Sequence, residues 1–149
     1  MDLYRAISDQ ILTYAARIDL GDFEGVADIL ADATVTAEGM PESWHGRDAI
    51  HALYAEGTRR YPETGTPRTK HVTTNIIVVV DDGGRTATAR SYFCVFQAVP
   101  GSLALQPIIA GRYADRFELR ESGWRFVRRH MTVDLVGDLS QHLLQDFPM

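Results

Sequence analysis

The sequence has little cysteine and no long apolar run. Cys94 is the only cysteine among 149 residues, so an internal disulfide cannot form, as is typical of proteins from a reducing compartment. The longest aliphatic run, residues 76–80, is far shorter than the roughly 20 residues of a membrane-spanning helix. Residues 1–10 lack the basic and apolar regions of a secretion signal. These absences predict a cytoplasmic protein that has no membrane partner.

Positive charge and cofactor motifs are also scarce. Lys and Arg number 15 against 20 Asp and Glu, a net charge of -5, whereas nucleic-acid binding depends on clustered basic residues. The five histidines show no metal-ligand spacing such as HExxH, and no CxxC, GxSxG, P-loop or GxGxxG motif is present. We therefore expect no nucleic-acid partner, no metal and no cofactor, and we expect a small molecule as the ligand.

What remains is the composition of one folded domain. Hydrophobic residues make up 45% of the chain and charged residues 23%, as in ordinary globular proteins. A chain of 149 residues can bury a core without disulfides or metal ions. There are no internal repeats or linkers, so residues 1–149 are predicted to form a single domain.

The first third of the chain has helical periodicity. Apolar residues recur at steps of three and four from Leu3 to Ile18, which predicts an amphipathic helix, and Gly21 suits the end of that helix. Asp22 is placed to cap a second helix that runs to Leu30.

A short strand and a third helix follow. Alternation predicts the strand over residues 34–38, and residues 39–46 are predicted to be a loop. From about Arg47 apolar residues again share one helical face, and the Gly- and Pro-containing stretch 61–67 ends that helix.

The second half of the chain has a period of two. Alternation, with turn residues between the segments, predicts four long antiparallel strands over Thr69–Val80, Thr86–Ala98, Ile108–Arg120 and Trp124–Leu135. Residues 139–147 are predicted to be a short helix or a flexible tail. Three helices followed by a strand meander indicate an α+β fold in which the helices cover one face of the sheet and enclose a pocket.

The first long strand is apolar on both faces. Residues 72, 76, 78 and 80 on one side, and residues 77 and 79 on the other, are aliphatic, so neither face suits free exposure to water. If the helices cover one face, a second copy of the chain is the simplest cover for the other. We expect a homo-oligomer, a dimer or a trimer.

Polar residues interrupt two otherwise apolar patterns. Alternation places His71, Thr73 and Asn75 on one face of the strand that begins at residue 69. Asp19 lies in the last turn of the first helix, where the helix dipole disfavours a carboxylate, so a tertiary partner is expected. Tyr14 lies on the buried stripe of the same helix, either as a core residue or with its hydroxyl in a pocket.

Two arginines lie within the last predicted strand. Alternation groups Arg129 with Val127, Met131 and Val133, and Arg128 with the opposite face. Both suit the surface, but an arginine that faced inward would need an anionic partner and would offer a site for an anion or oxyanion.

This order of elements, with these residues, resembles the SnoaL-like branch of the nuclear-transport-factor-like superfamily. The resemblance is carried by the stretches YAARIDLGDFEGVADILADA, WHGRDAI, RTKHVTTN and AGRYADRFELRESGWRFVRR. It implies a conical, barrel-like fold in which a strongly curved, mostly antiparallel sheet and three N-terminal helices enclose a pocket. The pattern is most similar to scytalone dehydratase, bile acid 7α-dehydratase and hexachlorocyclohexane dehydrochlorinase.

The resemblance also implies a site. These enzymes pair a helix aspartate with a strand histidine that abstracts a proton, and Asp19 and His71 fall at the matching positions. Tyr14 matches a helix tyrosine of some dehydratases, and Arg129, or the adjacent Arg128, matches a pocket arginine. Asn75 is expected to orient the substrate.

Two functions follow as hypotheses. The first is a cofactor-independent lyase or isomerase that acts on a small cyclic or polyketide-like substrate. The alternative is a non-catalytic subunit for ligand binding or assembly, such as the small subunit of a ring-hydroxylating dioxygenase. The same fold carries both, so the site must decide between them.

Overall fold

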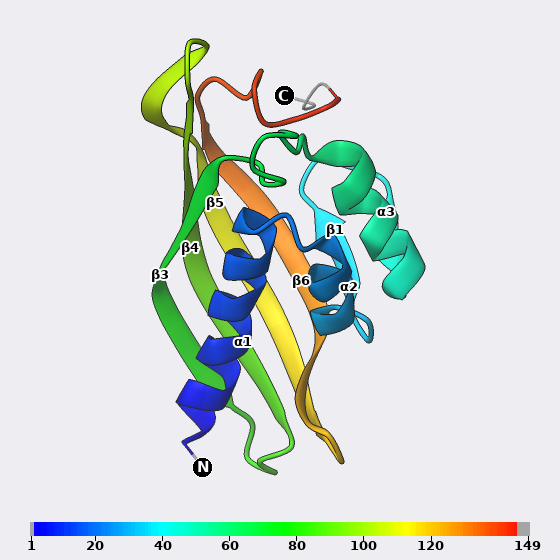
Figure 1. Cartoon of the computed structure of the whole chain (residues 1–149). Helices are drawn as coiled ribbons and strands as arrows, with labels where there is room; N and C mark the ends of the chain where they lie inside the picture. Colours follow the sequence, from blue (N-terminus) through cyan, green and yellow to red (C-terminus); the bar gives the residue numbers. More distant parts are fainter. Residues whose placement is uncertain (1, 146–149) are drawn as a thin grey trace.

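Figure 1 shows a computed structural model of the protein, which describes residues 2–145. Within these residues the chain forms three helices and six strands. In chain order they are α1 (Leu3–Asp19), α2 (Phe23–Ile29), β1 (Thr34–Ala37), β2 (Ser43–His45), α3 (Arg47–Gly57), β3 (Thr69–Val80), β4 (Thr86–Val99), β5 (Leu103–Arg120) and β6 (Gly123–Val136). No helix in the described part of the chain is long and apolar enough to cross a membrane.

The strands form one sheet in the order β2-β1-β6-β5-β4-β3. Neighbouring strands are antiparallel except β1 and β6, which are parallel. The four long strands curve, and the helices lie on one side of them, with α1 across the middle of the sheet (Figure 1). The α+β fold predicted from the sequence is confirmed.

The helix boundaries follow the predicted signals. The Asp2 side chain accepts hydrogen bonds from the first backbone amides of α1, and the Asp22 side chain accepts one from the Gly25 amide at 2.9 Å to start α2. Between the two helices, Gly21 has a φ of 74°, which an L side chain rarely adopts. Local sequence thus positions the end of α1, where Asp19 lies.

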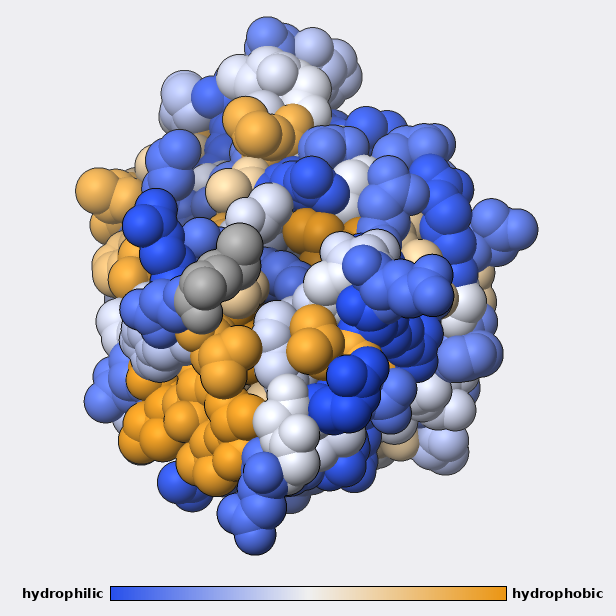
Figure 2. Space-filling view, turned by 90° about the horizontal axis from the view of Figure 1, so that it is seen from below, coloured by the Kyte–Doolittle hydropathy of each residue, from blue (hydrophilic) through white to orange (hydrophobic). Residues whose placement is uncertain are grey.

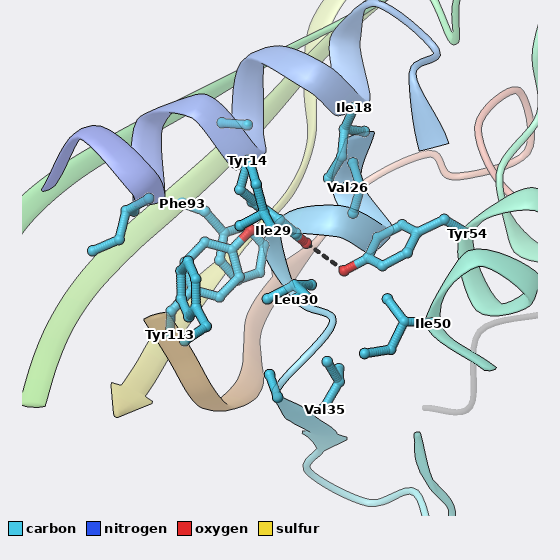
Figure 3. Close-up of a cluster of buried hydrophobic side chains, with 14 of the residues drawn as sticks. Tyr14, Ile18, Val26, Ile29, Leu30, Val35, Ile50, Tyr54, Phe93 and Tyr113 are labelled. Atoms are coloured by element: carbon cyan, nitrogen blue, oxygen red, sulfur yellow. Dashed lines mark hydrogen bonds between the residues drawn. The ribbon is translucent and has the colours of Figure 1, made fainter. Parts of the chain in front are cut away.

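The core lies between the helices and the concave face of the sheet. The inward stripe of α1 packs with α2, β1 and α3 in a continuous apolar cluster, much of which is visible in Figure 3. Its members include Ile7, Ile11, Ile18, Val26, Leu30, Val35, Ile50, Phe117 and Phe126. This burial is the main favourable term in folding.

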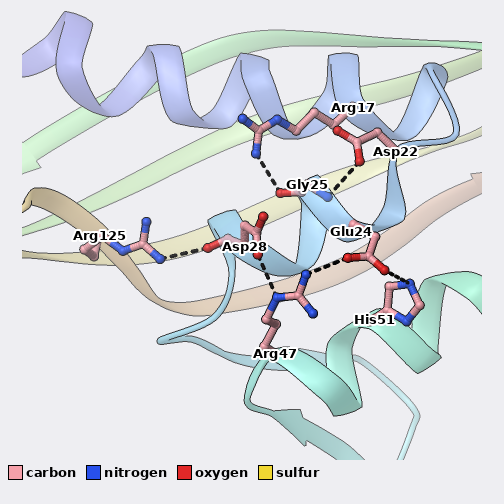
Figure 4. A network of polar contacts seen from close by, with 8 residues as sticks. All are labelled: Arg17, Asp22, Glu24, Gly25, Asp28, Arg47, His51 and Arg125. Carbon is pink, nitrogen blue, oxygen red and sulfur yellow. Dashed lines mark hydrogen bonds and ion pairs between the residues drawn. The ribbon is translucent and has the colours of Figure 1, made fainter.

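Outside the core, a polar network ties α2 to its neighbours (Figure 4). The Arg47 guanidinium donates to Asp28 at 2.7 Å and to Glu24 at 2.8 Å, and Arg125 donates to the Asp28 carbonyl oxygen at 2.8 Å. These side chains are largely exposed to solvent, so each pair contributes little to stability. The network orients α3 against α2 and contacts none of the polar residues predicted for the site.

Two β-bulges change which residues face inward. In β3 the pairing with β4 shifts between Thr74 and Ile77, and Asn75 has a φ of 56°. In β6 the pairing with β5 shifts around Val127, so that Phe126 and Arg129 are both buried. The prediction that Asn75 shares a face with His71 is therefore wrong, as is the grouping of Val127 with Arg129, because each bulge reverses the alternation beyond it.

Three boundaries also differ from prediction. The predicted loop 39–46 contains the strand β2, which pairs with β1. β5 begins at Leu103 rather than at 108, because the turn at 100–102 is tight enough for the strands to pair at once. Residues 139–145 form a turn and a single bridge between Thr58 and Leu143, not a helix, and residues 146–147 lie outside the described part of the chain.

The convex face of the sheet carries exposed apolar side chains. Val72, Ile77 and Val79 of β3 are 42%, 52% and 55% exposed, and Tyr92 of β4 and Leu135 of β6 are exposed as well. Figure 2, which looks at the molecule from below, shows a hydrophobic patch at its lower left. Apolar patches of this kind are typical of surfaces that contact other molecules.

Candidate active site

The end of α1 and the start of β3 bring Asp19 and His71 into contact. His71 Nδ1 lies 2.6 Å from Asp19 Oδ1, and the His71 backbone amide donates to Asp19 Oδ2 at 2.8 Å. The Thr69 hydroxyl donates to Oδ1 at 2.8 Å. Both carboxylate oxygens are thus held by β3, which fixes the position of Asp19 relative to the imidazole.

Asp19 is ionised in this setting. Its side chain is only 11% exposed, and that of His71 only 8%. Burial raises the pKa of Asp19, but the hydrogen bonds and charge of His71, together with the Thr69 hydroxyl, more than offset it and hold the pKa below its ordinary value. A carboxylate that accepts the Nδ1 proton leaves the lone pair of the neutral imidazole on Nε2.

His71 lines a cavity of about 160 Å³ under the helices. The walls are largely apolar and come from β4, β5 and β6, with α1 and the segment after β6 closing the space. They include Ile18, Phe93, Val95, Ile109, Met131 and Val133. Since apolar walls exclude water, electrostatic interactions with a ligand in this cavity are stronger than in solution.

Two tyrosine hydroxyls lie at the same cavity. Tyr14 of α1 and Tyr54 of α3 share a hydrogen bond of 2.6 Å between their hydroxyl oxygens (Figure 3), and both residues line the space beside His71. Burial, reinforced by the nearby Tyr14 hydroxyl, raises the pKa of Tyr54 well above its ordinary value, so Tyr54 stays neutral. The pair offers one free O–H proton to a ligand.

A second space adjoins the first. It measures about 230 Å³ and shares Tyr54, Thr58, Met131, Val133 and Leu143 with the inner cavity. Its other walls include Trp44 and Leu53, which are partly buried hydrophobic residues. The two spaces together form a pocket with a polar inner end and an apolar outer part.

Arg129 is buried, but it does not line the cavity. Its guanidinium makes two hydrogen bonds of 2.8 Å to Asp115 of β5, and both side chains are 0% exposed. It also lies 3.7 Å from the ring centroid of Tyr113 and 4.2 Å from that of Tyr14. The predicted role of Arg129 as a direct anion handle is corrected: its charge is already matched by Asp115, and it supports the back of the Tyr14 ring. Arg128 is exposed.

Sequence patterns identified some of these residues and missed others. Asp19 and His71 make contact, and His71 and Tyr14 line the cavity, whereas Asn75 lies on the convex side, in a depression with Tyr92 and Arg112. Asp115 was missed, although an acid between Tyr113 and Phe117 on an inward face is a detectable signal. Thr69, Tyr54 and His142 were also missed, and for them no local pattern was available.

The fold and the pocket together indicate the family to which the protein belongs. A curved, mostly antiparallel sheet with helices on its concave side is the architecture of nuclear-transport-factor-like proteins. The chain belongs to the SnoaL-like family: the SnoaL-like domain matches residues 1–130. Comparison with curated proteins gave no match.

Solved structures agree with this assignment. A nuclear-transport-factor-2-like protein with a cystatin-like fold from Novosphingobium aromaticivorans is 27% identical, with a TM-score of 0.72 over 87% of this chain and 80% of that chain. A protein of unknown function from Mycobacterium tuberculosis, Rv3472, is 25% identical, with a TM-score of 0.69 over 88% of this chain and 71% of that chain.

A third similar structure carries an enzyme name. It is a Novosphingobium aromaticivorans protein provisionally named scytalone dehydratase, 21% identical, with a TM-score of 0.69 over 90% of this chain and 85% of that chain. At this identity the likeness concerns the fold alone.

Proposed function

We propose that the protein is a cofactor-independent lyase or isomerase in which His71 abstracts a proton from carbon. The observation that carries the proposal is the contact of 2.6 Å between His71 Nδ1 and an ionised Asp19 at the wall of an apolar cavity. A histidine held in one tautomer by a carboxylate is a general base suited to neutral pH. The name of the scytalone dehydratase-like structure agrees with this reaction class.

The chemistry follows from the positions of the groups. His71 Nε2 takes the proton from a substrate carbon, and the electron pair of that C–H bond becomes part of a new double bond. Asp19 stabilises the imidazolium that forms. The hydroxyl pair of Tyr14 and Tyr54 donates a hydrogen bond to the oxygen or leaving group on which negative charge develops. In an elimination the leaving group departs, and in an isomerisation the proton returns at another carbon.

Loss of either member of the pair tests the proposal. On a substrate found by screening hydroxylated and halogenated cyclic compounds for loss of water or acid, His71→Ala is expected to lower kcat by about 10²- to 10⁴-fold. Asp19→Asn is expected to lower kcat strongly too, because an amide that donates to Nδ1 places the imidazole proton on Nε2.

A surface histidine provides the matched control. His51 of α3 lies outside the cavity, near Glu24, so His51→Ala should leave turnover unchanged. Full activity in His71→Ala or Asp19→Asn, with the fold intact by circular dichroism, would refute the mechanism and favour a non-catalytic binding subunit.

We also infer that the convex face of the sheet pairs with a second copy of the chain. Its exposed aliphatic side chains include Ile77, which lines the same depression as Arg112, and Arg112 pairs with Asp134, so one surface offers both apolar area and matched charges. Sedimentation equilibrium should therefore show a dimer or a trimer, and Ile77→Lys should shift it to monomers. A monomeric wild-type protein at high micromolar concentration would contradict this inference.

A further inference from the structure

A second histidine reaches the cavity from the segment that follows β6. His142 is 7% exposed and lines the same space as His71. The two imidazole rings face each other edge-on, with centroids 6.3 Å apart and an interplanar angle of 63°. The two rings therefore border the same space and lie close enough together for one small ligand to reach both.

The chain around His142 is held in place by its neighbours. The Gln97 amide donates to the Gln141 carbonyl oxygen at 3.0 Å, and the Tyr61 hydroxyl donates to the same oxygen at 2.5 Å. The Arg59 backbone amide donates to the His142 carbonyl oxygen at 2.8 Å. These bonds hold the backbone that carries the ring, and they do not depend on hydrogen bonds of the ring itself.

The imidazole of His142 has no partner among residues 2–145. Nδ1 is fully buried and makes no hydrogen bond, and Nε2 bonds to none of these residues either. A buried acceptor without a partner costs less than a buried N–H without one, so the proton belongs on Nε2. With Nδ1 against the protein, the Nε2–H edge is the one that meets the cavity.

His142 is also uncharged at the near-neutral pH at which His71 is proposed to act as a base. Burial, together with the charge of the nearby His71, lowers the pKa of His142 to about 4 despite the opposing effect of Asp19. A neutral imidazole in this tautomer donates one hydrogen bond and adds no charge beside the proton that His71 takes up.

We propose that His142 is a substrate-binding residue, and that its Nε2–H donates a hydrogen bond to a hydroxyl or carbonyl oxygen on a ring-shaped substrate. The proposal deepens the proposed function, on which it rests for the role of His71, by naming the substrate class: oxygenated rings rather than halogenated ones. An unpaired N–H in an apolar cavity selects ligands that bring an oxygen, because a ligand without one leaves that donor unsatisfied.

The size of the pocket agrees with a ring. A cavity of roughly 150 Å³ accommodates one benzene molecule, and the inner cavity measures about 160 Å³. The adjoining space of about 230 Å³ leaves room for a second ring or an apolar substituent. The oxygen then lies at the polar inner end, between His71, His142 and the tyrosine hydroxyls, and the apolar body extends towards Trp44.

Binding of 2-naphthol and naphthalene tests the proposal without turnover. Calorimetry should show that wild-type protein binds 2-naphthol more tightly than naphthalene. His142→Phe keeps a ring of similar size but no donor, and it should weaken 2-naphthol binding by about tenfold while leaving naphthalene binding unchanged. His142→Gln, whose amide can still donate, should retain part of the preference.

Controls separate the outcomes. His51→Phe should bind both probes as wild type does. Equal losses for both probes in His142→Phe, no preference for 2-naphthol in wild type, or no binding of 2-naphthol would each overturn the proposal. If His142→Phe fails to fold, the ¹⁵N resonance of His142 Nε2 in wild-type protein should still shift with 2-naphthol and not with naphthalene. Because none of these measurements needs turnover, they can fail or succeed independently of the kinetic test on His71.

Discussion

Two carboxylates are largely shielded from solvent, each against a basic side chain, and their surroundings differ. Asp115 and Arg129 are fully enclosed, joined by two hydrogen bonds of 2.8 Å and stacked against aromatic rings. His71, which pairs with Asp19, lines a cavity, and its imidazole keeps one nitrogen free of protein partners among residues 2–145.

The difference lies in whether the basic partner can change charge. Burial lowers the pKa of Arg129, but the charge and hydrogen bonds of Asp115 more than offset it, so the pKa lies above its ordinary value and the guanidinium stays protonated. Imidazole, unlike guanidinium, is a group that proteins use as a general base. A buried pair thus points to proton transfer only where one member is such a group and also borders open space.

Breaking the enclosed pair should have the largest effect on stability. Arg129→Met leaves the Asp115 carboxylate buried without a partner, so the free energy of unfolding measured in urea should fall by about 3–5 kcal/mol. Arg112→Met, which breaks the exposed pair with Asp134 on the convex face, should cost far less, because solvent screens an exposed pair. Equal losses in the two variants would show that the burial of Asp115 and Arg129 does not increase the cost of breaking their pair. Adding Asp115→Leu to Arg129→Met removes the unpaired carboxylate and should recover most of the lost stability.

The pH dependence of stability should come mainly from His142, which lines the cavity. Since the pKa of His142 is about 4 in the folded protein and about 6.5 in the unfolded chain, only the unfolded chain gains a proton between these values. Stability should therefore fall as the pH drops from about 6.5 to about 4, by up to about 3 kcal/mol from this residue.

A variant isolates that contribution. His142→Phe should flatten the curve of unfolding free energy over this range, as followed by urea titration at several pH values. The contribution of Asp19 belongs to a more acidic range, because its pKa lies below the ordinary value of 3.8 and its stabilisation is lost only as the pH falls through that lowered pKa. An unchanged slope in His142→Phe would mean that His142 is protonated in the folded protein.

Much of the fold was predictable because its signals are local. Helical periodicity, the caps at Asp22 and Gly21, and the alternation of the long strands each depend on a few neighbouring residues. The bulges at Asn75 and Val127 could not be predicted from such signals. A bulge adds one residue to a strand without a distinctive composition, yet it reverses the facing of every later side chain in that strand.

The site was predictable only in part, for the same reason. Asp19 and His71 are 52 positions apart, and their pairing came from resemblance and from the unfavourable place of Asp19 at a helix end. The pairing of Arg129 with Asp115 depends on strand register, and the position of His142 depends on the course of the chain after β6. Single-sequence patterns specify neither. Only the inward direction of Asp115 was visible in the sequence, from its place between two inward aromatic residues.

The bulge in β3 has a consequence for how the protein can be altered. Upstream of Asn75 the inward residues are Thr69, which donates to Asp19, and His71, which lines the pocket, and downstream the inward residues, Ile76 and Val78, pack against the core. The bulge thus divides β3 into a first half that faces the pocket and a second half that packs against the core. Substitutions in the first half of β3 should therefore act on the Asp19–His71 pair and the pocket, whereas substitutions in the second half should act on the core and so on stability.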